Sequence, residues 1–186
     1  MALVLNEEQS MLRDSARAFL AAEAPLSHLR ALRDRADSIG YSPDLWRRCA
    51  QMGYASVLIA EAHGGSGLGL TEAMVIAEEF GRTLAPTPYL STAVLGARLL
   101  GTSTNASVRA HWLPRMAAGS AVTALAVDEH ARHRPTAITL LARASDDGFR
   151  LHGNKLFVID GHVADLILVA ASLSLPGTKE DRKSVV

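Results

Sequence analysis

A glycine-rich segment is the first candidate for chemistry in this sequence, because glycine loops can cradle phosphate groups. Gly65, Gly67 and Gly69 form a G-x-G-x-G pattern, but it lacks the last spacing of a dinucleotide-binding loop and the Gly-Lys-Ser/Thr of a P-loop. Leu68 stands where the nucleophile motif G-x-S-x-G needs its final glycine. The segment therefore predicts a sharp turn with left-handed residues, and a role in shaping an adjacent pocket stays open.

A cluster of histidine and arginine is the second candidate, since it could hold a metal ion or an anion. His130 and His133 lie three residues apart, with Arg132 and Arg134 beside them. Pro135 argues against a helix that would place both imidazoles on one face, and no nearby cysteine or acidic cluster completes a tetrahedral metal site. We expect a solvated cationic loop; as a ligand, a phosphate group suits these side chains better than a metal.

Acidic pairs are the third candidate. Asp128 and Glu129 are neighbours in an apolar run, and neighbours in a strand point to opposite faces, so they do not predict a matched acid–base pair. Asp146 and Asp147 precede a glycine and indicate a turn. The serine, histidine and aspartate residues lack the spacing of a nucleophile motif. The residues alone predict no catalytic group.

Helix signals dominate the first part of the chain. Asn6 with Gln9 predicts a capping box, and Ser42 followed by Pro43 predicts another helix start. Pro114 predicts a break or kink after the residue before it. The expected helices are one that begins after Asn6 and five more at residues 26–38, 43–52, 71–80, 91–100 and 106–118.

The pattern changes at Ser120, where runs typical of strands replace the helix signals. Such runs cover residues 121–129, 137–145, 149–158 and 164–171. We therefore predict an α+β fold, with an N-terminal all-helical domain at residues 1–119 followed by a partial antiparallel β-barrel domain at residues 120–172. Residues 173–186 are polar and rich in breakers, so we expect a polar tail or linker there.

Composition excludes several classes of protein. Nineteen lysine and arginine residues balance nineteen aspartate and glutamate residues among 186, which leaves no basic excess for nucleic acid or a membrane surface. No apolar run approaches the ~20 residues of a membrane-spanning helix. Cys49 is the only cysteine, so there is no disulfide framework. The first residues do not resemble a signal peptide, and we expect a cytoplasmic protein.

A string of segments along residues 3–172 resembles the flavin-dependent acyl-CoA dehydrogenase family, and their order and spacing carry the resemblance. The most distinctive stretch, residues 59–69 continuing to Gly81, is similar to the family's proline-glutamate-x-x-glycine-glycine-x-glycine loop and following helix, with Ala60 in place of the proline. The other segments are Leu5-Asn6-Glu7-Glu8-Gln9, Trp46 with Met52-Gly53-Tyr54, Trp112-Leu113-Pro114 with Ala118-Gly119, Leu151-x-Gly153-x-Lys155-x-Phe157-Val158, and Ala164-Asp165.

The resemblance implies an N-terminal helical domain, a middle β-barrel and a C-terminal four-helix bundle, assembled as homo- or hetero-oligomers with similar subunits. It implies FAD as cofactor, an acyl-CoA as substrate and a flavin-type electron acceptor, in lipid metabolism such as fatty acid oxidation. A carboxylate removes the α-proton of the thioester while a hydride leaves the β-carbon for the flavin. The protein holds the acyl chain against the flavin ring.

Family positions also imply site residues. Asp128 stands where the family has a threonine whose hydroxyl contacts the flavin, and Ile159 stands where a second flavin-contacting strand ends in threonine. His133 and Arg134 fall on the side of the acyl-CoA phosphates, and Arg134 replaces a serine that meets the substrate. The implied cofactor-binding residues are Leu125, Ala126, Val127, Asp128 and Glu129 in one tract and Phe157, Val158 and Ile159 in another.

The family's catalytic glutamate normally lies in the C-terminal domain, which has no counterpart in these 186 residues. We therefore expect a fragment or incomplete subunit of an acyl-CoA dehydrogenase that is inactive alone, with no catalytic residue of its own. The replacements at Asp128 and Ile159 favour an alternative hypothesis, a non-catalytic partner subunit of a heteromeric acyl-CoA dehydrogenase whose flavin contacts have degenerated.

Overall fold

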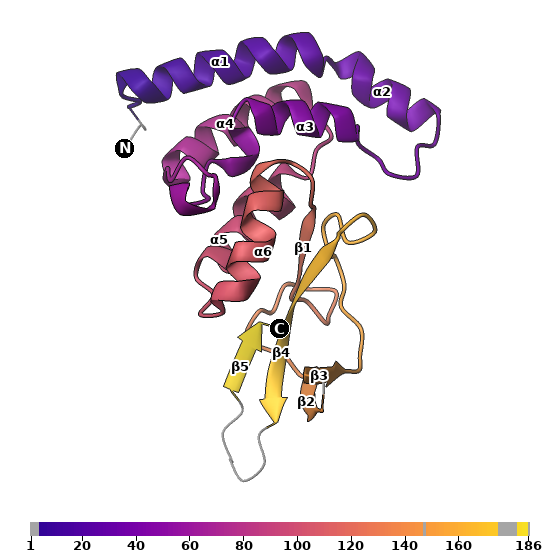
Figure 1. Ribbon diagram of the computed structural model, residues 1–186. Coiled ribbons are helices and arrows are strands. Elements are labelled where there is room, and N and C mark those ends of the chain that lie inside the picture. Colours follow the sequence, from indigo (N-terminus) through magenta and orange to yellow (C-terminus); the bar gives the residue numbers. More distant parts are fainter. Residues whose placement is uncertain (1–3, 147, 175–181, 186) are drawn as a thin grey trace. The chain divides into compact units, whose positions relative to one another are not determined.

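The computed structural model describes residues 4–146, 148–174 and 182–185, the last of these and residue 174 by their backbone only. The chain separates into two compact units, Met1–Val122 and Thr123–Val186, and each is described here by itself (Figure 1). The division falls between residues 122 and 123, whereas the sequence analysis places it between 119 and 120.

The first unit is helical, and local signals explain where its helices begin. The Asn6 side chain accepts a hydrogen bond from the Gln9 N–H at 2.8 Å, and the Gln9 side chain accepts one from the Asn6 N–H at 3.1 Å, so the predicted capping box is confirmed. The α-helices are α1 (Glu7–Glu23), α2 (Leu26–Asp34), α3 (Pro43–Gln51), α4 (Leu70–Thr83), α5 (Ala97–Gly101) and α6 (Ala106–Ala117), with 3₁₀ turns at Tyr54–Ser56 and Glu61–His63 and a π-helical segment at Tyr89–Gly96.

Helix α6 does not break where the sequence predicts. It contains Pro114 and continues to Ala117. Leu113 and Met116, on either side of the proline, are both fully buried. Their packing holds the last turn in place although the proline removes one backbone hydrogen bond, because burial of two large apolar side chains is worth several kcal/mol.

The glycine-rich segment is the sharp turn that the sequence predicts. Gly64 and Gly67 adopt the left-handed region with φ of 80° and 63°, which glycine reaches without the steric cost of a side chain. Gly65 is needed for a different reason, because a Cβ atom on it would lie 1.9 Å from the carbonyl oxygen of Ile59. The turn folds back on residues 57–59, and the Leu68 N–H donates to the Val57 carbonyl at 2.9 Å.

An aromatic chain forms the centre of the helical core. Phe19 meets Tyr54 edge-on, Tyr54 meets Phe80 edge-on, and Phe80 stacks on Tyr89 with ring centroids 4.7 Å apart. The buried Tyr89 hydroxyl donates to the Ala73 carbonyl at 2.9 Å, so its polar atom is satisfied inside the core. These contacts join α1, the first 3₁₀ turn, α4 and the π-helical segment.

One carboxylate is buried between α1 and α4. The Glu79 side chain is 1% exposed and accepts two hydrogen bonds from Arg17, from Nε at 3.0 Å and Nη2 at 2.9 Å. Arg82 Nε donates to it at 3.1 Å. The hydrogen bonds from Arg17 lower the pKa of Glu79, against the opposing effect of burial. The pair therefore fixes how α1 packs on α4.

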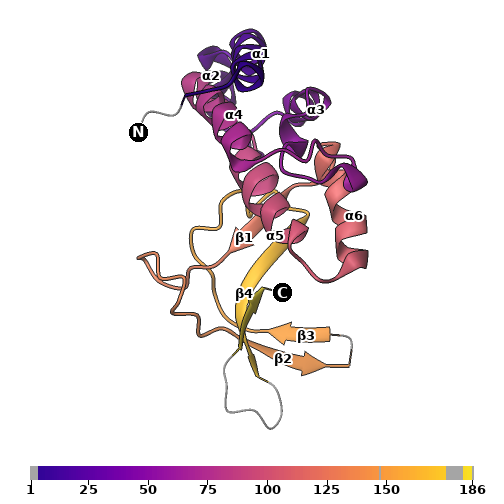
Figure 2. The same ribbon diagram turned by 90° about the vertical axis from the view of Figure 1, so that its left-hand side faces the viewer.

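The second unit is a small mixed sheet of β1 (Thr123–Ala126), β2 (Leu141–Ser145), β3 (Gly148–Leu151), β4 (Leu166–Ser174) and β5 (Arg182–Val185), seen along two directions in Figures 1 and 2. Strand β4 is central: it pairs with β1 and β2 in parallel and with β5 antiparallel, and β2 pairs antiparallel with β3. The α+β fold class is confirmed, but the expectation of an antiparallel sheet is wrong for two of these pairings. The chain between β1 and β4 is long enough for a parallel crossover.

Two strand predictions in this unit need correction. The strand expected at residues 149–158 ends at Leu151, because Gly153 (φ 150°) and Phe157 (φ 55°) leave the extended region. The expected polar tail at 173–186 instead begins with the end of β4 and contains β5 at residues 182–185; residues 175–181 and 186 lie outside the described residues. Among the described helices, none is long and apolar enough to cross a membrane.

Replacing Arg17 by methionine should destabilise the helical unit. The change removes two of the hydrogen bonds to a buried carboxylate, so we expect the free energy of unfolding to fall by about 1–3 kcal/mol. Urea denaturation followed by far-ultraviolet circular dichroism measures this loss. Because the folded-state pKa of Glu79 lies below its ordinary value of 4.5, the contribution is present above that pH and is lost as the pH falls through the folded-state pKa.

Arg13→Met is the matched control, since Arg13 lies on the same helix and pairs with the exposed Asp14. We expect this control to change the free energy of unfolding by less than about 0.5 kcal/mol. An equal loss in the two variants would contradict the assignment, and so would a difference that persists in strong acid.

Candidate functional site

In the second unit, the residues directly before the Phe157–Ile159 tract bind the Leu125–Glu129 tract. The first tract, Leu125–Glu129, continues from the end of β1, and the second tract, Phe157–Ile159, lies in the irregular segment between β3 and β4. The Leu156 N–H donates to the Asp128 carbonyl at 2.7 Å, and the Lys155 ammonium donates to the Val127 carbonyl at 3.0 Å. Segments nearly thirty residues apart thus lie side by side, although neither hydrogen bond belongs to a strand ladder.

A buried ion pair fixes this junction. Lys155 Nζ lies 2.8 Å from Glu129 Oε1, and the two side chains are 6% and 8% exposed. Glu129 also accepts hydrogen bonds from the Leu140 N–H at 3.0 Å, the Thr139 N–H at 2.9 Å and the Thr139 hydroxyl. Burial raises the pKa of Glu129, but the hydrogen bonds from Lys155, Thr139 and Leu140 outweigh it and lower the pKa to about 2. Glu129 is therefore a structural anion and does not exchange protons near neutral pH.

The Asp128 side chain turns to the loop that follows it. Its two oxygens lie 3.0 and 2.9 Å from His133 Nδ1, and one of them accepts a hydrogen bond from the Arg134 N–H at 3.1 Å. The hydrogen bond from His133 and then that from Arg134 lower the pKa of Asp128. Asp128 thus holds the exposed His133 side chain and the Arg134 backbone, which no sequence pattern indicates.

The remaining predicted residues divide between a cavity and the surface. A cavity of about 440 Å³ in the second unit is lined by Ala126 and Val158 from the two tracts, with Lys155 and His162 among its polar groups. Phe157 and Ile159 are instead 71% and 49% exposed and present large apolar side chains to the outside of the unit. The structure therefore joins the two tracts but does not gather all their side chains on one wall.

Lys155 and His162 are the residues that sequence reasoning missed at this junction. Lys155 is part of the family-like segment Leu151–Val158, but no local signal indicates its partner, because Glu129 lies 26 residues earlier in the chain. His162 follows an Asp160-Gly161 turn and belongs to no sequence motif that would indicate a functional role. No group of three or more metal-ligating side chains occurs within the described residues, and His130 lies in an exposed loop.

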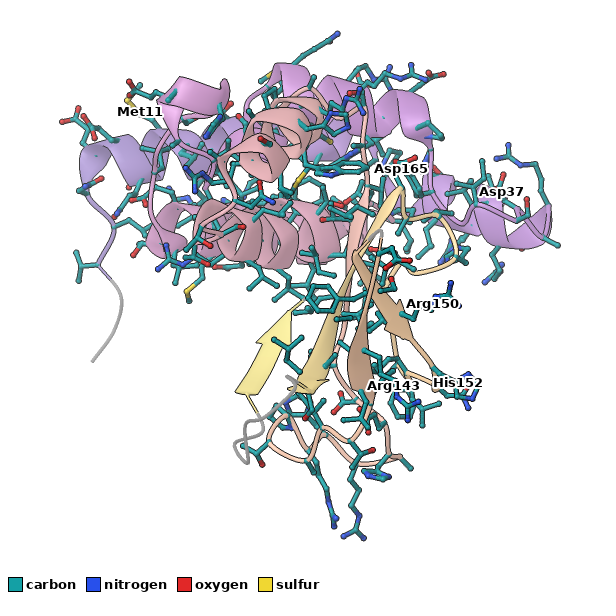
Figure 3. All side chains as sticks on the ribbon, turned by 60° about the horizontal axis from the view of Figure 1, so that its bottom comes forward. Met11, Asp37, Arg143, Arg150, His152 and Asp165 are labelled. Atoms are coloured by element: carbon teal, nitrogen blue, oxygen red, sulfur yellow. The ribbon has the colours of Figure 1, made fainter. Side chains whose placement is uncertain are left out.

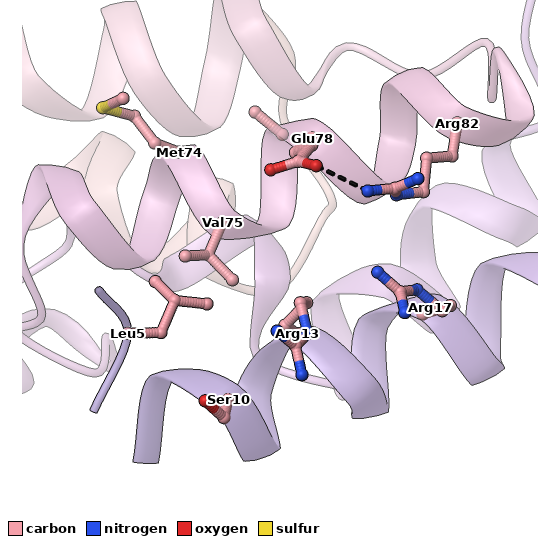
Figure 4. Close-up of a pocket in the computed structure, with 9 residues that line it drawn as sticks. Leu5, Ser10, Arg13, Arg17, Met74, Val75, Glu78 and Arg82 are labelled. Atoms are coloured by element: carbon pink, nitrogen blue, oxygen red, sulfur yellow. Dashed lines mark hydrogen bonds and ion pairs between the residues drawn. The ribbon is translucent and has the colours of Figure 1, made fainter. Parts of the chain in front are cut away.

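A larger cavity of about 760 Å³ lies in the helical unit between α1 and α4, and Figure 4 shows its lining. Leu5, Met74 and Val75 are apolar, while Arg13, Arg17 and Arg82 bring cations. Each arginine already has a carboxylate partner: Asp14 for Arg13, Glu79 for Arg17, and both Glu78 and Glu79 for Arg82. The charges of this cavity are balanced within the protein, so it offers no unsatisfied charge to an ionic ligand.

Comparison with known proteins gives concordant results. The family model for the N-terminal domain of acyl-CoA dehydrogenases matches residues 6–120. Acyl-CoA dehydrogenase IpdE2 of Mycobacterium tuberculosis is 31% identical over 167 residues, which are 89% of this chain and 43% of that protein. Mitochondrial isovaleryl-CoA dehydrogenase of Bos taurus is 27% identical over 90% of this chain and 39% of its own length.

Solved structures show the same relationship. A variant of the Tcur3481–Tcur3483 steroid ACAD superposes with a TM-score of 0.81 at 33% identity, over 90% of this chain and 45% of that chain. The ChsE4–ChsE5 complex from Mycobacterium tuberculosis superposes with a TM-score of 0.83 at 26% identity, over 100% of this chain and 48% of that chain.

This chain thus spans less than half the length of the relatives it matches. The family model covers more than half of this chain, and both the helical unit and the small mixed sheet that follows it correspond to the fold of these relatives. The chain belongs to the acyl-CoA dehydrogenase family, and its residues 6–120 are the family's N-terminal domain.

Proposed function

We propose that the chain supplies the flavin-facing and substrate-facing wall of an enzyme that introduces an α,β double bond into an acyl-CoA thioester. The observation that carries the proposal is the junction of the two tracts, held by the 2.7 Å hydrogen bond from Leu156 to Asp128 and by the Lys155 ammonium. A wall of this kind needs fixed backbone positions, because productive geometry tolerates errors of only a fraction of an ångström.

The residues at the junction fit the ring system of FAD, the cofactor that the family resemblance implies. Phe157 and Ile159 expose apolar surface that a flat ring can cover. The Asp128 carboxylate is turned to His133 and Arg134, so its charge is engaged within the loop. Of the residues that the resemblance implies for the cofactor, Phe157 and Ile159 would face the ring, whereas Glu129 would support the backbone behind them. When bound, FAD supplies the acceptor for the hydride that leaves the β-carbon.

The chain's own residues position and bind in this proposal. His133 and Arg134, held by Asp128, offer cationic and N–H donors to the phosphates of the acyl-CoA. The apolar side chains of the second tract exclude water from the face that the acyl chain approaches. No described residue is placed as the base that removes the α-proton; we assign that carboxylate to the part of the enzyme that corresponds to the remaining length of the relatives.

Partner subunits follow from the same reasoning. Two of the similar structures carry paired names, Tcur3481–Tcur3483 and ChsE4–ChsE5, and the second is described as a complex. We extend this to the present chain and propose that it works in a hetero-oligomer with a second acyl-CoA dehydrogenase-like subunit, and that a flavin-type acceptor takes the electrons. The chain alone is expected to be inactive.

A second candidate function is a non-catalytic partner subunit. The observation that favours it is the Asp128–His133 contact, with an Nδ1–O distance of 2.9 Å, at the position where the family has a flavin-contacting threonine. Ile159 likewise offers no hydroxyl where the resemblance implies one. In this case the chain would stabilise a flavin-binding partner without holding FAD through its own tracts.

Titration with FAD separates the two candidates. We expect the chain, together with a flavin-binding homologous subunit, to quench FAD fluorescence through its own tracts. Ile159→Thr should then lower the dissociation constant about three- to tenfold, because one added hydrogen bond is worth about 0.5–1.5 kcal/mol. Ile39→Thr is the matched control, since Ile39 is a similarly exposed isoleucine of the helical unit, and it should leave the affinity unchanged.

If neither the wild type nor Ile159→Thr adds FAD sites beyond those of the homologous subunit, the first candidate is wrong. Retained complex formation, measured by analytical ultracentrifugation, would in that case establish the non-catalytic role. Failure of both FAD binding and complex formation would exclude both candidates.

Removal of the buried cation at the junction should loosen both tracts. Lys155→Met leaves the Glu129 carboxylate buried without a charge partner, and we expect a loss of about 3–5 kcal/mol in the stability of the second unit. Hydrogen exchange of the Leu140 and Leu156 amides measures the opening. Because the pKa of Glu129 is about 2 in the folded state and ordinarily 4.5, the wild-type protection is complete above pH 4.5 and is lost as the pH falls toward 2.

The double variant Lys155→Met with Glu129→Gln tests the cause. It removes both charges, so it should recover a large part of the lost protection. Arg132→Met, in an exposed part of the same unit, serves as the control and should exchange like the wild type. Equal loss in the single and double variants would show that the lysine acts by packing and not by its charge.

A further inference from the structure

Two arginines face each other across the β2–β3 hairpin. In the antiparallel register of these strands, Arg143 is directly opposite Arg150, so their side chains leave the sheet on the same face and their Cβ atoms are about 5 Å apart. Leu141 and His152 extend the same alternation by two residues toward the open end of the hairpin. Figure 3 labels Arg143, Arg150 and His152, which gather along this hairpin.

The positive charge of this pair has no counterpart within the described part of the chain. Arg143, Arg150 and His152 are exposed, and none of the ion pairs or side-chain hydrogen bonds among the described residues includes them. Like charges directly opposite in a sheet are destabilising. The arginines of the helical cavity differ in this respect, because each of those is paired with a carboxylate.

The same three side chains line a concavity. A cavity of about 380 Å³ is bounded by Arg143, Arg150 and His152 together with Leu141 and Thr139. Its volume is in the range of small-molecule sites, and Leu141 gives it one apolar surface. Behind Thr139, the Glu129 carboxylate that accepts from its hydroxyl is paired with the Lys155 ammonium.

We propose that this face of the β2–β3 hairpin binds an organic phosphate, with one phosphate group bridging Arg143 and Arg150. Two guanidinium forks on one side of a sheet present parallel N–H donors, which match the oxygens of a phosphate in the bidentate manner. A dianion also removes the repulsion between the arginines, which a single carboxylate does only in part. His152 and Leu141 then contact the organic part of the ligand. None of these residues belongs to the proposed flavin wall, so the site does not depend on the proposed function.

Calorimetric titration of the full 186-residue chain tests the site at constant ionic strength. The probes are ADP, coenzyme A, 3′-dephospho-coenzyme A, inorganic phosphate, pantetheine and acetate. We expect the phosphate compounds to bind and pantetheine and acetate not to bind. If coenzyme A binds more tightly than its 3′-dephospho form, the preferred group is a phosphate monoester. If coenzyme A, its 3′-dephospho form and ADP bind with equal affinity, the preferred group is the diphosphate. If inorganic phosphate binds as tightly as these compounds, free phosphate is the source.

Substitutions locate the binding. Arg143→Gln and Arg150→Gln should each raise the dissociation constant for ADP at least about tenfold, because each removes a charge-assisted pair of hydrogen bonds. Arg150→Lys keeps the charge but loses the fork, so its effect should be intermediate. Arg30→Gln, with the same charge change at an exposed position of α2 in the helical unit, is the matched control and should bind like the wild type.

Thermal melting shows whether a variant that loses binding is still folded. Without ligand, Arg143→Gln and Arg150→Gln should melt at the same temperature as the wild type or higher, since repulsion is relieved. With ADP, the wild type and Arg30→Gln should gain stability, and the two hairpin variants should gain less. The proposal is overturned if no phosphate compound binds the wild type, if acetate binds as well as phosphate, if Arg30→Gln weakens binding as much as the hairpin variants, or if the unliganded variants melt lower.

Discussion

The ion pair between Glu129 and Lys155 is the constraint on which the second unit's arrangement depends. The segments at residues 127–129 and 155–156 lie outside the strands, so no strand ladder aligns them, and the ion pair ties them to Leu140, whose carbonyl accepts from the Ser172 N–H at the edge of the β2–β4 pairing. A carboxylate that accepts from two backbone N–H groups, a hydroxyl and an ammonium takes the place of that ladder. Because either charge alone would be costly to bury, the segments have one favourable arrangement, and the two tracts of the candidate site share it.

The helical unit could be predicted from the sequence to a large extent, because its signals are local. Asn6 and Gln9 complete the predicted capping box, and the glycine turn follows from the need for positive φ at Gly64 and Gly67. The sheet could not be predicted in the same detail. Whether β4 pairs in parallel or antiparallel depends on partners far along the chain, as in the pairs Thr123–Leu166 and Leu141–Ser172. The strand after Gly148 ends at Leu151, just before Gly153 takes a positive φ.

The contacts near the candidate site could be predicted only in part, for a related reason. The resemblance to the family indicated the two tracts, and in the structure the residues just before the second tract bind the first. The charges that hold them were not indicated, because the partner of Glu129 and the orientation of Asp128 are set by tertiary contacts. The two acidic neighbours thus have different roles. The buried Glu129 binds backbone N–H groups, whereas Asp128 binds the exposed loop of His133 and Arg134.

The chain has zero net charge, but only some of the charged side chains that the structure describes have a partner of opposite charge. Glu79, Glu129 and Asp128, whose side chains are 1%, 8% and 16% exposed, each lie within hydrogen-bonding distance of basic side chains, so these carboxylates are compensated locally. Arg143 and Arg150 are uncompensated among the described residues, although they face each other. Overall neutrality argues against an extended surface that binds a polyanion. It does not exclude a site for one phosphate, since such a site needs only two unpaired guanidinium groups at the right spacing. The residual charge of a balanced protein therefore marks where a small anionic ligand can bind.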